Sequence, residues 1–236
     1  MPAIILVKPQ LGENIGMVAR AMLNCGLTDL RIVKPRDGWP SDHAIRASSG
    51  ALEKGVNARI FETTAEAVKD LHFTFATTVR PRDMIKECYT ATAAMEQAHT
   101  KIVQGQGVGV LFGAERTGLE NEDIALASAI VTIPLNPNFS SLNLAQAVLL
   151  IAYEFMTQAD KTPDKQLMTG KTDIANADTV EKFTGRLVNA LSDNGFFKSQ
   201  DMRPTVERNL TNLFARQTWT DQDIKTLQGV LSSFIR

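Results

Sequence analysis

The first group of residues that could do chemistry is Asn14, Gly16 and Arg20, which follow an apolar run near the N-terminus. Asn14 can cap a helix, and Gly16 removes the side chain nearest the end of the preceding strand. Arg20 lies one to two turns further along the expected helix, so the three residues could hold an anion at the helix N-terminus. The same pattern fits a capped helix with one exposed arginine, and this segment alone does not separate the two interpretations.

The second group lies in the segment 111–123, where an apolar run ends at Gly113 and is followed by Glu115 and Arg116. In an α/β sheet, ligands bind in the crevice outside the carboxyl ends of the strands, which is where these residues would stand. Gly113 and Gly118 would let the backbone approach a ligand closely. The alternative is a solvated loop with an incidental ion pair.

The third group is a polar loop between an apolar strand and a long apolar helix, within residues 133–155. Ser140, Ser141 and Asn143 lie in this loop together with two prolines and two further asparagines, whereas a structural turn needs only one or two such residues. The helix that follows begins at a side chain able to cap it and has apolar residues at helical spacing. The pattern therefore predicts a preorganised ligand site on a rigid base.

The elements that must position these residues alternate between strand and helix patterns. Helices are expected at 14–24, at 64–70 with Thr64 as its cap, at 91–103 and from 144 onward. Because the strand runs are mostly apolar, they predict a parallel sheet covered on both faces, and thus an α/β domain of about 160 residues. The expected strands are residues 3–7, 30–33, 73–78, 109–112 and 129–133.

The chain divides into three parts by its pattern. Residues 1–160 form the α/β domain, residues 161–178 are polar and punctuated and are interpreted as a linker, and residues 179–236 form a small all-helical extension. Three amphipathic stripes in this last part predict three helices.

Composition excludes several classes of function. The net charge of -1 gives no general attraction to polyanions, although it permits a local basic patch. Cys25 and Cys88 have no CxxC spacing and the three histidines form no cluster, so no metal site and no disulfide are expected. No apolar run approaches the roughly 20 residues of a membrane span and no signal peptide is evident, so a cytoplasmic protein is expected. The glycines at 105, 107 and 109 precede their strand, which argues against a dinucleotide-binding enzyme. An α/β nucleotide enzyme of another kind is kept as an alternative, which binding of NAD or ATP rather than SAM would favour.

In this order and at these separations, the three groups resemble the SPOUT (SpoU–TrmD) class of RNA methyltransferases, in the TrmH-like branch. The chain is most similar to TrmJ-type enzymes, which 2'-O-methylate a ribose in the tRNA anticodon loop. The match runs from the first strand through Phe155, and segments 193–197 and 202–216 also resemble TrmJ-type extensions. The resemblance implies S-adenosylmethionine (SAM) as cofactor, a C-terminal trefoil knot in the α/β domain, and a homodimer.

The resemblance also assigns residues. The catalytic and substrate positions of the family fall on Asn14, Arg20, Glu115, Ser140 and Asn143, and Arg20 of one protomer would face the SAM bound by the other. The cofactor positions, most of them acting through backbone groups, fall on Thr77, Thr78, Val79, Gly113, Ile133, Ser140, Ser141 and Leu142.

The expected reaction is SAM-dependent 2'-O-methylation of a ribose in RNA, with tRNA favoured over rRNA and a pyrimidine at position 32, the start of the anticodon loop, as target. A guanidinium is essentially always protonated, so Arg20 is expected to bind an RNA phosphate and stabilise the developing alkoxide, with Asn14 and Glu115 orienting it. The alternatives are 2'-O-methylation of rRNA and a non-catalytic SAM- or RNA-binding module. The basic residues expected to contact RNA are Arg20, Arg80, Arg82, Lys86, Arg116, Arg203, Arg208 and Arg216.

Overall fold

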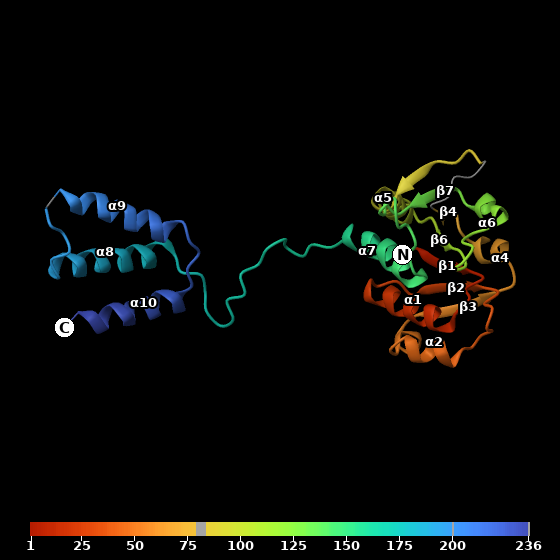
Figure 1. The fold of residues 1–236 in the computed structure, drawn as a ribbon, viewed down its shortest axis with the longest axis horizontal. Coiled ribbons are helices and arrows are strands. Elements are labelled where there is room, and N and C mark those ends of the chain that lie inside the picture. The colour runs from red at the N-terminus through yellow and green to blue at the C-terminus, as the bar shows by residue number, and fades with distance from the viewer. Residues whose placement is uncertain (79–83, 200, 236) are drawn as a thin grey trace. The chain divides into compact units, whose positions relative to one another are not determined.

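The computed structural model describes residues 1–78, 84–199 and 201–235 and divides into two compact units, Met1–Thr162 and Pro163–Arg236 (Figure 1). Each unit has its own hydrophobic core.

The first unit is built on one sheet of seven strands, all paired in parallel, in the order β3-β2-β1-β6-β4-β7-β5. The fold class expected from the sequence, an α/β protein with a parallel sheet, is confirmed. The strands are β1 (Ala3–Val7), β2 (Asp29–Val33), β3 (Asn57–Phe61), β4 (Phe73–Thr77), β5 (Cys88–Thr90), β6 (Val108–Phe112) and β7 (Ala129–Thr132).

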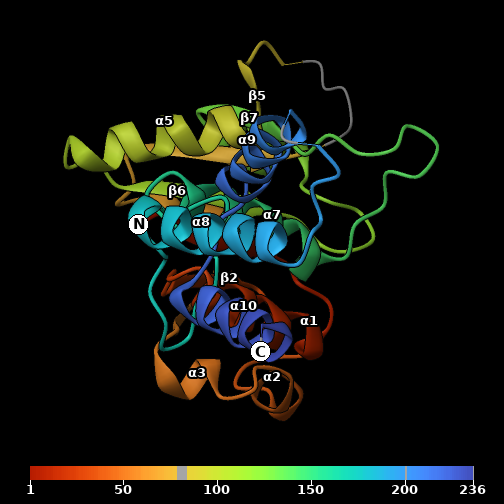
Figure 2. The same cartoon turned by 90° about the vertical axis from the view of Figure 1, so that its left-hand side faces the viewer.

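Helices cover both faces of this sheet (Figures 1 and 2). Successive residues of a strand point to opposite faces, so Ile4 and Leu6 of β1 join one core while Ile5 and Val7 join the other. The larger core receives α1, α5 and α7, and the smaller one receives α4 and α6. The helices of this unit are α1 (Gly12–Asn24), α2 (Asp42–Ala47), α3 (Ala51–Lys54), α4 (Thr64–Val68), α5 (Ala91–Val103), α6 (Asn121–Leu126) and α7 (Leu144–Thr157).

Two helix starts differ from the sequence-based expectation. The helix at 64 is capped by Thr63, whose hydroxyl accepts from the amide of Glu66 at 3.1 Å, whereas Thr64 donates to Asp123 Oδ1 at 2.6 Å. Asn14 does not cap α1, because that helix already begins at Gly12 and Asn14 is buried in its first turn. Thr63 and Thr64 can each cap a helix by residue type, whereas the N-cap of α1 is Leu11, which has no capping side chain, so residue type alone did not locate either helix start.

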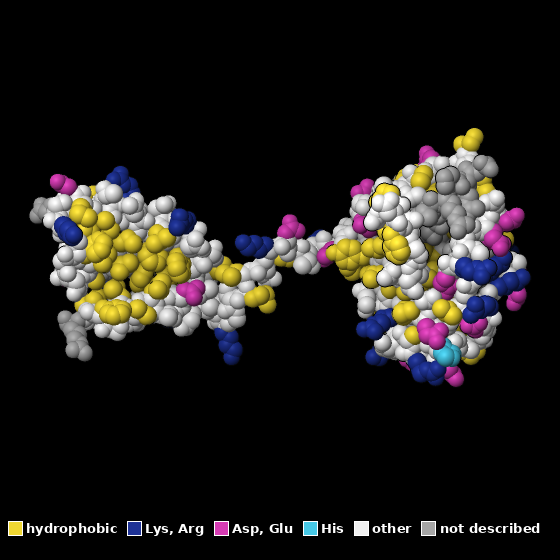
Figure 3. Space-filling view, in the orientation of Figure 1, with side chains coloured by type: hydrophobic (Ala, Val, Ile, Leu, Met, Phe, Trp, Pro, Cys, Tyr) yellow, Lys and Arg dark blue, Asp and Glu magenta, His cyan; other side chains and the backbone are white. Residues whose placement is uncertain are grey.

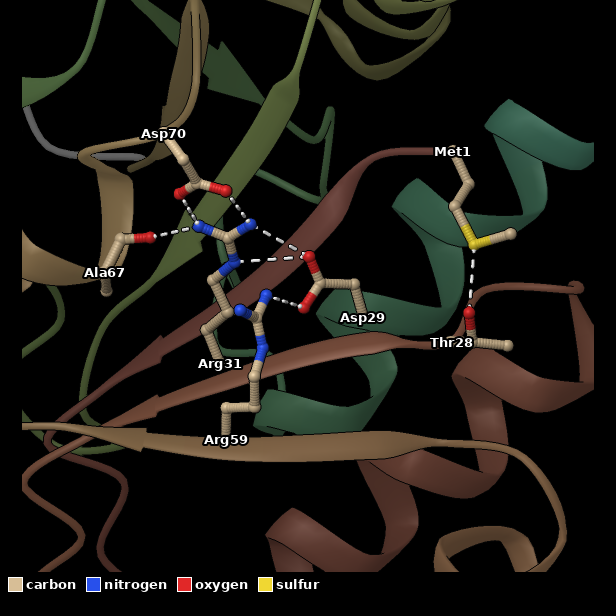
Figure 4. A network of polar contacts seen from close by, with 7 residues as sticks. All are labelled: Met1, Thr28, Asp29, Arg31, Arg59, Ala67 and Asp70. Carbon is tan, nitrogen blue, oxygen red and sulfur yellow. Dashed lines mark hydrogen bonds and ion pairs between the residues drawn. The ribbon is translucent and has the colours of Figure 1, made fainter.

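A buried arginine fastens α4 to the sheet (Figure 4). Arg31 of β2 has a side chain only 3% exposed, and its guanidinium donates to the carbonyl of Ala67 at 2.6 Å and to Asp70 Oδ2 at 2.9 Å. Asp29 accepts from the same guanidinium at 2.9 Å and also from Arg59 at 2.8 Å. The bond from Arg31 lowers the pKa of the Asp70 carboxyl below its ordinary value. The single positive charge that Arg31 brings into the interior is therefore matched by carboxylate and carbonyl oxygens.

The second unit contains α8 (Ala177–Asp193), α9 (Met202–Ala215) and α10 (Asp221–Phe234), as the three amphipathic stripes predict. Its core is small, with Phe183, Phe214 and Ile224 as its buried members. A bridge between Ile174 and Thr220 ties the chain entering α8 to the start of α10. Figure 3 shows hydrophobic side chains gathered across one face of these helices.

Candidate active site

The candidate active site lies at the carboxyl ends of β6, β4 and β7, which are neighbours in the sheet. A cavity of about 510 Å³ opens there, within the range typical of small-molecule sites. Seven residues that the resemblance assigns to the cofactor lie on its wall, and the eighth, Val79, lies outside the described residues. The seven are Thr77, Thr78, Gly113, Ile133, Ser140, Ser141 and Leu142.

The walls of this cavity are largely apolar, and some polar groups on them are already used. The hydroxyl of Thr77 donates to the carbonyl of Leu111 at 2.8 Å, so the side chain of this residue ties two strands together. Sequence reasoning missed several wall residues, although the period of two along β7 was a usable signal, since Val131 lies two residues before Ile133. The missed apolar wall residues are Phe112, Ala114, Leu119, Val131, Leu135, Leu144 and Ala147.

The loop after β6 folds back tightly on itself at Gly113. A Cβ at this position would lie 2.0 Å from the carbonyl carbon of Gly118 and 2.1 Å from the nitrogen of Leu119, so only glycine fits. Gly118 has a left-handed backbone (φ 72°), and its amide donates to the carbonyl of Ala114 at 2.8 Å. The two glycines therefore let the loop approach itself, in addition to any approach to a ligand.

Glu115 reaches from this loop to the start of α1, more than a hundred residues earlier. Its carboxylate accepts hydrogen bonds from the amides of Gln10 at 2.8 Å and Leu11 at 3.4 Å, and from the side-chain amide of Asn14 at 2.7 Å. Leu11 is the N-cap of α1 and cannot cap the helix with its own side chain. A carboxylate from a different segment thus serves the backbone at this helix start.

Asn143 joins the third segment to the other two. It caps α7, because its Oδ1 accepts from the backbone amide of Ala145 at 2.8 Å while its own backbone amide donates to Gln146 Oε1 at 3.1 Å. Its side-chain nitrogen donates to Asn14 Oδ1 at 2.9 Å. Three segments that the sequence marked separately are therefore connected by one chain of bonds, Glu115 to Asn14 to Asn143, beside the cavity.

Arg20 takes no part in this series of hydrogen bonds. It is exposed, it is not among the residues that line the cavity, and its guanidinium donates to the hydroxyl of Ser49 at 3.1 Å. Within one chain, Asn14 and Glu115 bind each other and the start of α1 rather than Arg20, so the expectation that they orient Arg20 is not met by these contacts.

Two further basic residues near the site differ from Arg20 in their contacts. Lys86 donates to the carbonyls of Ala125 and Ala127, where α6 ends, so its charge serves a helix C-terminus. Arg116 lies on the cavity wall and is exposed. Arg80 and Arg82, which the sequence also suggested as RNA contacts, lie outside the described residues.

Lys8 and Glu120 form an ion pair near the strand ends. The two charged groups are 2.7 Å apart, and their hydrogen bond raises the pKa of Lys8. Both side chains are about half exposed, so the pair contributes little to stability.

Among residues 1–78, 84–199 and 201–235, no three His, Cys, Asp or Glu side chains lie close enough together to hold a metal ion. None of the helices in the same residues is long and apolar enough to span a bilayer.

Comparison with known proteins places this arrangement in a family. Residues 1–153 match the model of the SpoU rRNA Methylase family. The tRNA (cytidine/uridine-2'-O-)-methyltransferase TrmJ of Photorhabdus laumondii is 34% identical over 98% of this chain and 95% of its own length. The crystal structure of TrmJ from Z. mobilis ZM4 superposes with a TM-score of 0.84 at 48% identity, covering 100% of both chains.

A further solved structure bears the description "Structural insights into the 2-OH methylation of C/U34 on tRNA". It has a TM-score of 0.54 at 28% identity and covers 67% of this chain and 95% of its own. The matches to the family model and to the full-length relatives together leave one conclusion: this chain belongs to the SpoU methylase family of methyltransferases.

Proposed function

We propose that this protein transfers a methyl group from SAM to the 2'-hydroxyl of a ribose in tRNA. The observation that carries the proposal is the chain of bonds from Glu115 through Asn14 to Asn143, which fixes all three marked segments around one cavity. Such a site is preorganised, as a reaction that depends on alignment of two substrates requires.

The relatives support tRNA as the acceptor, because the Photorhabdus protein is named a tRNA (cytidine/uridine-2'-O-)-methyltransferase over nearly the full length of this chain. We propose a pyrimidine at position 32 of the anticodon loop as the target. The structure described as concerning C/U34 is less similar and matches only the first two thirds of the chain. A tRNA substrate is consistent with a cytoplasmic protein.

The cavity suits SAM in size and in chemistry. Its apolar residues can receive an adenine ring, and backbone groups of the loops at 113–119 and 133–143 can bind its polar edge. The residues that would hold the cofactor are Thr77, Thr78, Gly113, Ile133, Ser140, Ser141 and Leu142, with Val79 assigned from the resemblance alone. When bound, SAM supplies an electrophilic methyl group.

The protein's own residues would do three things for the reaction. The network of Glu115, Asn14 and Asn143 holds the loops that shape the cavity, and Ser140 lies on the cavity wall where it can meet the acceptor ribose. Arg20 carries a permanent positive charge, which would bind an RNA phosphate and stabilise the alkoxide as the hydroxyl loses its proton. The proton leaves to phosphate or water, because a guanidinium does not act readily as a base.

We further propose a homodimer in which each protomer offers Arg20 to the cavity of its partner. The support is that Arg20 does not line the cavity of its own chain, although the family resemblance assigns it to the reaction. The trefoil knot implied by the same resemblance is part of this proposal.

Incubation of the protein with radiolabelled SAM and bulk tRNA, in parallel with bulk rRNA, tests the proposed function. We expect label in tRNA, and mapping of the 2'-O-methylated nucleotide should place it at position 32. Label at position 34 would keep the reaction and change the target, and label in rRNA alone would overturn the choice of acceptor. Intact SAM binding without label in either RNA would contradict catalysis on these substrates.

A further inference from the structure

The spacing of Gly16 and Arg20 has a structural explanation in the contact between α1 and the end of α2. A Cβ on Gly16 would lie 2.2 Å from the carbonyl oxygen of Ala44 and 2.9 Å from the nitrogen of Ser48. Glycine therefore lets the chain around Ser48 pack directly on α1. Residues four apart lie on one face of a helix, so the residue that meets the next part of that chain is Arg20.

The chain that packs there makes a tight turn. Ser48 is fully buried and helical in conformation, and it is followed by two left-handed residues, Ser49 (φ 50°) and Gly50 (φ 85°). The amide of Ala51 closes the turn on the carbonyl of Ser48 at 3.0 Å. The hydroxyl of Ser48 donates to the carbonyl of Ile45 at 2.8 Å and fixes the turn from inside.

This turn leaves two successive backbone donors without an acceptor. In the part of the chain that the structure describes, the amides of Ser49 and Gly50 make no hydrogen bond. Successive amides in a right-handed then left-handed sequence form a concavity that binds anions. The hydroxyl of Ser49 meanwhile holds the guanidinium of Arg20 beside them.

The charges around the turn favour an anion. Arg20 is in contact with Ser49, and the exposed Arg46 lies in the last turn of α2. Lys54 Nζ lies 3.4 Å from the position that a Cβ of Gly50 would take, and the Glu53 carboxylate lies 3.5 Å from it. Arg20 and Lys54 thus lie at the turn beside one carboxylate, with Arg46 two residues before Ser48 in the chain, on a protein whose net charge is -1.

We propose that the amides of Ser49 and Gly50, together with Arg20, bind one phosphodiester of the substrate RNA. The inference rests on the proposed function, since it specifies where the RNA backbone is held when Arg20 acts. It also explains why Arg20 is anchored on the turn that follows α2. A phosphate bound by two fixed amides would lie beside the guanidinium, and the ribose attached to that phosphate would be held in place with it.

The simpler interpretation is that Ser49 and Gly50 only end α2 and that water satisfies their amides. The two interpretations differ in what an added negative charge does to RNA affinity. Ser49→Asp places a carboxylate at the proposed phosphate position, where it would repel the RNA backbone. Gln104→Asp adds the same charge to an exposed residue at the end of α5 and is the matched control.

The experiment measures the affinity of the full-length protein for a synthetic anticodon stem-loop by fluorescence anisotropy. We expect Ser49→Asp to weaken binding about tenfold through repulsion of the phosphate, with Gln104→Asp within about twofold of wild type. Replacing phosphates one at a time by neutral methylphosphonate should identify a single position that weakens binding of wild type and not of Ser49→Asp. Calorimetric affinity for SAM should be the same in all variants, which shows that they are folded.

Equal RNA affinities of Ser49→Asp and Gln104→Asp would overturn the proposal, and so would an unchanged methylphosphonate profile in Ser49→Asp or failure of wild type to bind the stem-loop. Failure of the proposed function has a different signature: wild type binds the stem-loop with the expected phosphate dependence and transfers no methyl group to tRNA.

Discussion

Glu115 illustrates, at the scale of single residues, how a side chain on the cavity wall can hold other residues of the site in place. Its two carboxylate oxygens accept from two backbone amides and from Asn14, and all three donors belong to the start of α1. Both oxygens of the carboxylate are thus directed at the start of α1. We interpret Glu115 as a positioning residue that holds Asn14, and through it Asn143, in place.

This interpretation predicts the behaviour of Glu115→Gln. A glutamine must point its NH₂ group at one of the N–H donors, so we expect the free energy of unfolding to fall by about 1 to 3 kcal/mol. Methyl transfer should slow, while the shape of its dependence on pH should stay the same, because no titrating base is lost. Thermal unfolding and pH–rate profiles measure this, with the exposed Glu122→Gln as control. Loss of one limb of the pH profile would instead identify Glu115 as a general base.

At the residue scale, the sequence marked the right segments and could not show their connections. Asn14, Glu115 and Asn143 were selected one by one, and the bonds that join them span 101 and 129 residues. Gly16 was interpreted as space for an anion, whereas its neighbours show it is space for α2. The signal for the turn at 48–50 was present as Ser-Ser-Gly, but nothing local connects a turn to an arginine 29 residues earlier.

At the scale of elements, strands buried on both faces were predictable and the edges of the sheet were not. The five predicted strands appear with ends shifted by at most one residue. β3 was missed because Asn57, Arg59 and Ile60 are exposed, which breaks up its apolar run. β5 has only three residues and lies at the other edge of the sheet. Edge strands take their structure from their neighbour more than from their own sequence.

The attachment of α4 to the sheet through Arg31 should depend on pH. The pKa of Asp70 is lowered in the folded protein, so this bond stabilises the fold above the ordinary carboxyl pKa and the stabilisation is lost as pH falls through the lowered value. Asp70→Asn should therefore lower the urea midpoint at pH 6, and the difference from wild type should shrink below about pH 4. Asp164→Asn, an exposed carboxylate between α7 and α8, is the control. A difference that stays constant from pH 6 to pH 3 would show that the ion pair is not responsible.

At the scale of the whole molecule, the two units should differ in stability. The second unit has Phe183, Phe214 and Ile224 as its buried core members, and Phe214 packs edge-on against Phe183 with ring centroids 5.2 Å apart. Phe214→Ala removes about 3 to 5 kcal/mol, as much as so small a core usually supplies. We expect this variant to lose the folded signal of Trp219 while SAM affinity stays near wild type. Phe234→Ala, at a side chain 75% exposed, should change neither.

The proposed dimer makes a prediction that no single-chain arrangement shares. Arg20→Ala should lose roughly 10²- to 10⁴-fold in rate. Leu142→Trp should fill the cavity and block SAM binding. If Arg20 acts on the partner's cavity, exchanging subunits between the two inactive variants should restore about a quarter of wild-type activity, since half of the dimers then hold one complete site. Methyl transfer by the exchanged mixture measures this, and a mixture as inactive as its components would show that each site is built within one chain.

The long reach of Glu115 and Asn143 also bears on how the protein is made. A ribosome delivers α1 early, but the carboxylate that completes its first turn follows 101 residues after Asn14, and Asn143 follows 129 residues after it. At ordinary rates of translation, the start of this helix waits on the order of ten seconds for its partners. Until then the nascent chain has no assembled site, so catalytic competence arrives only once synthesis of the α/β unit is nearly complete.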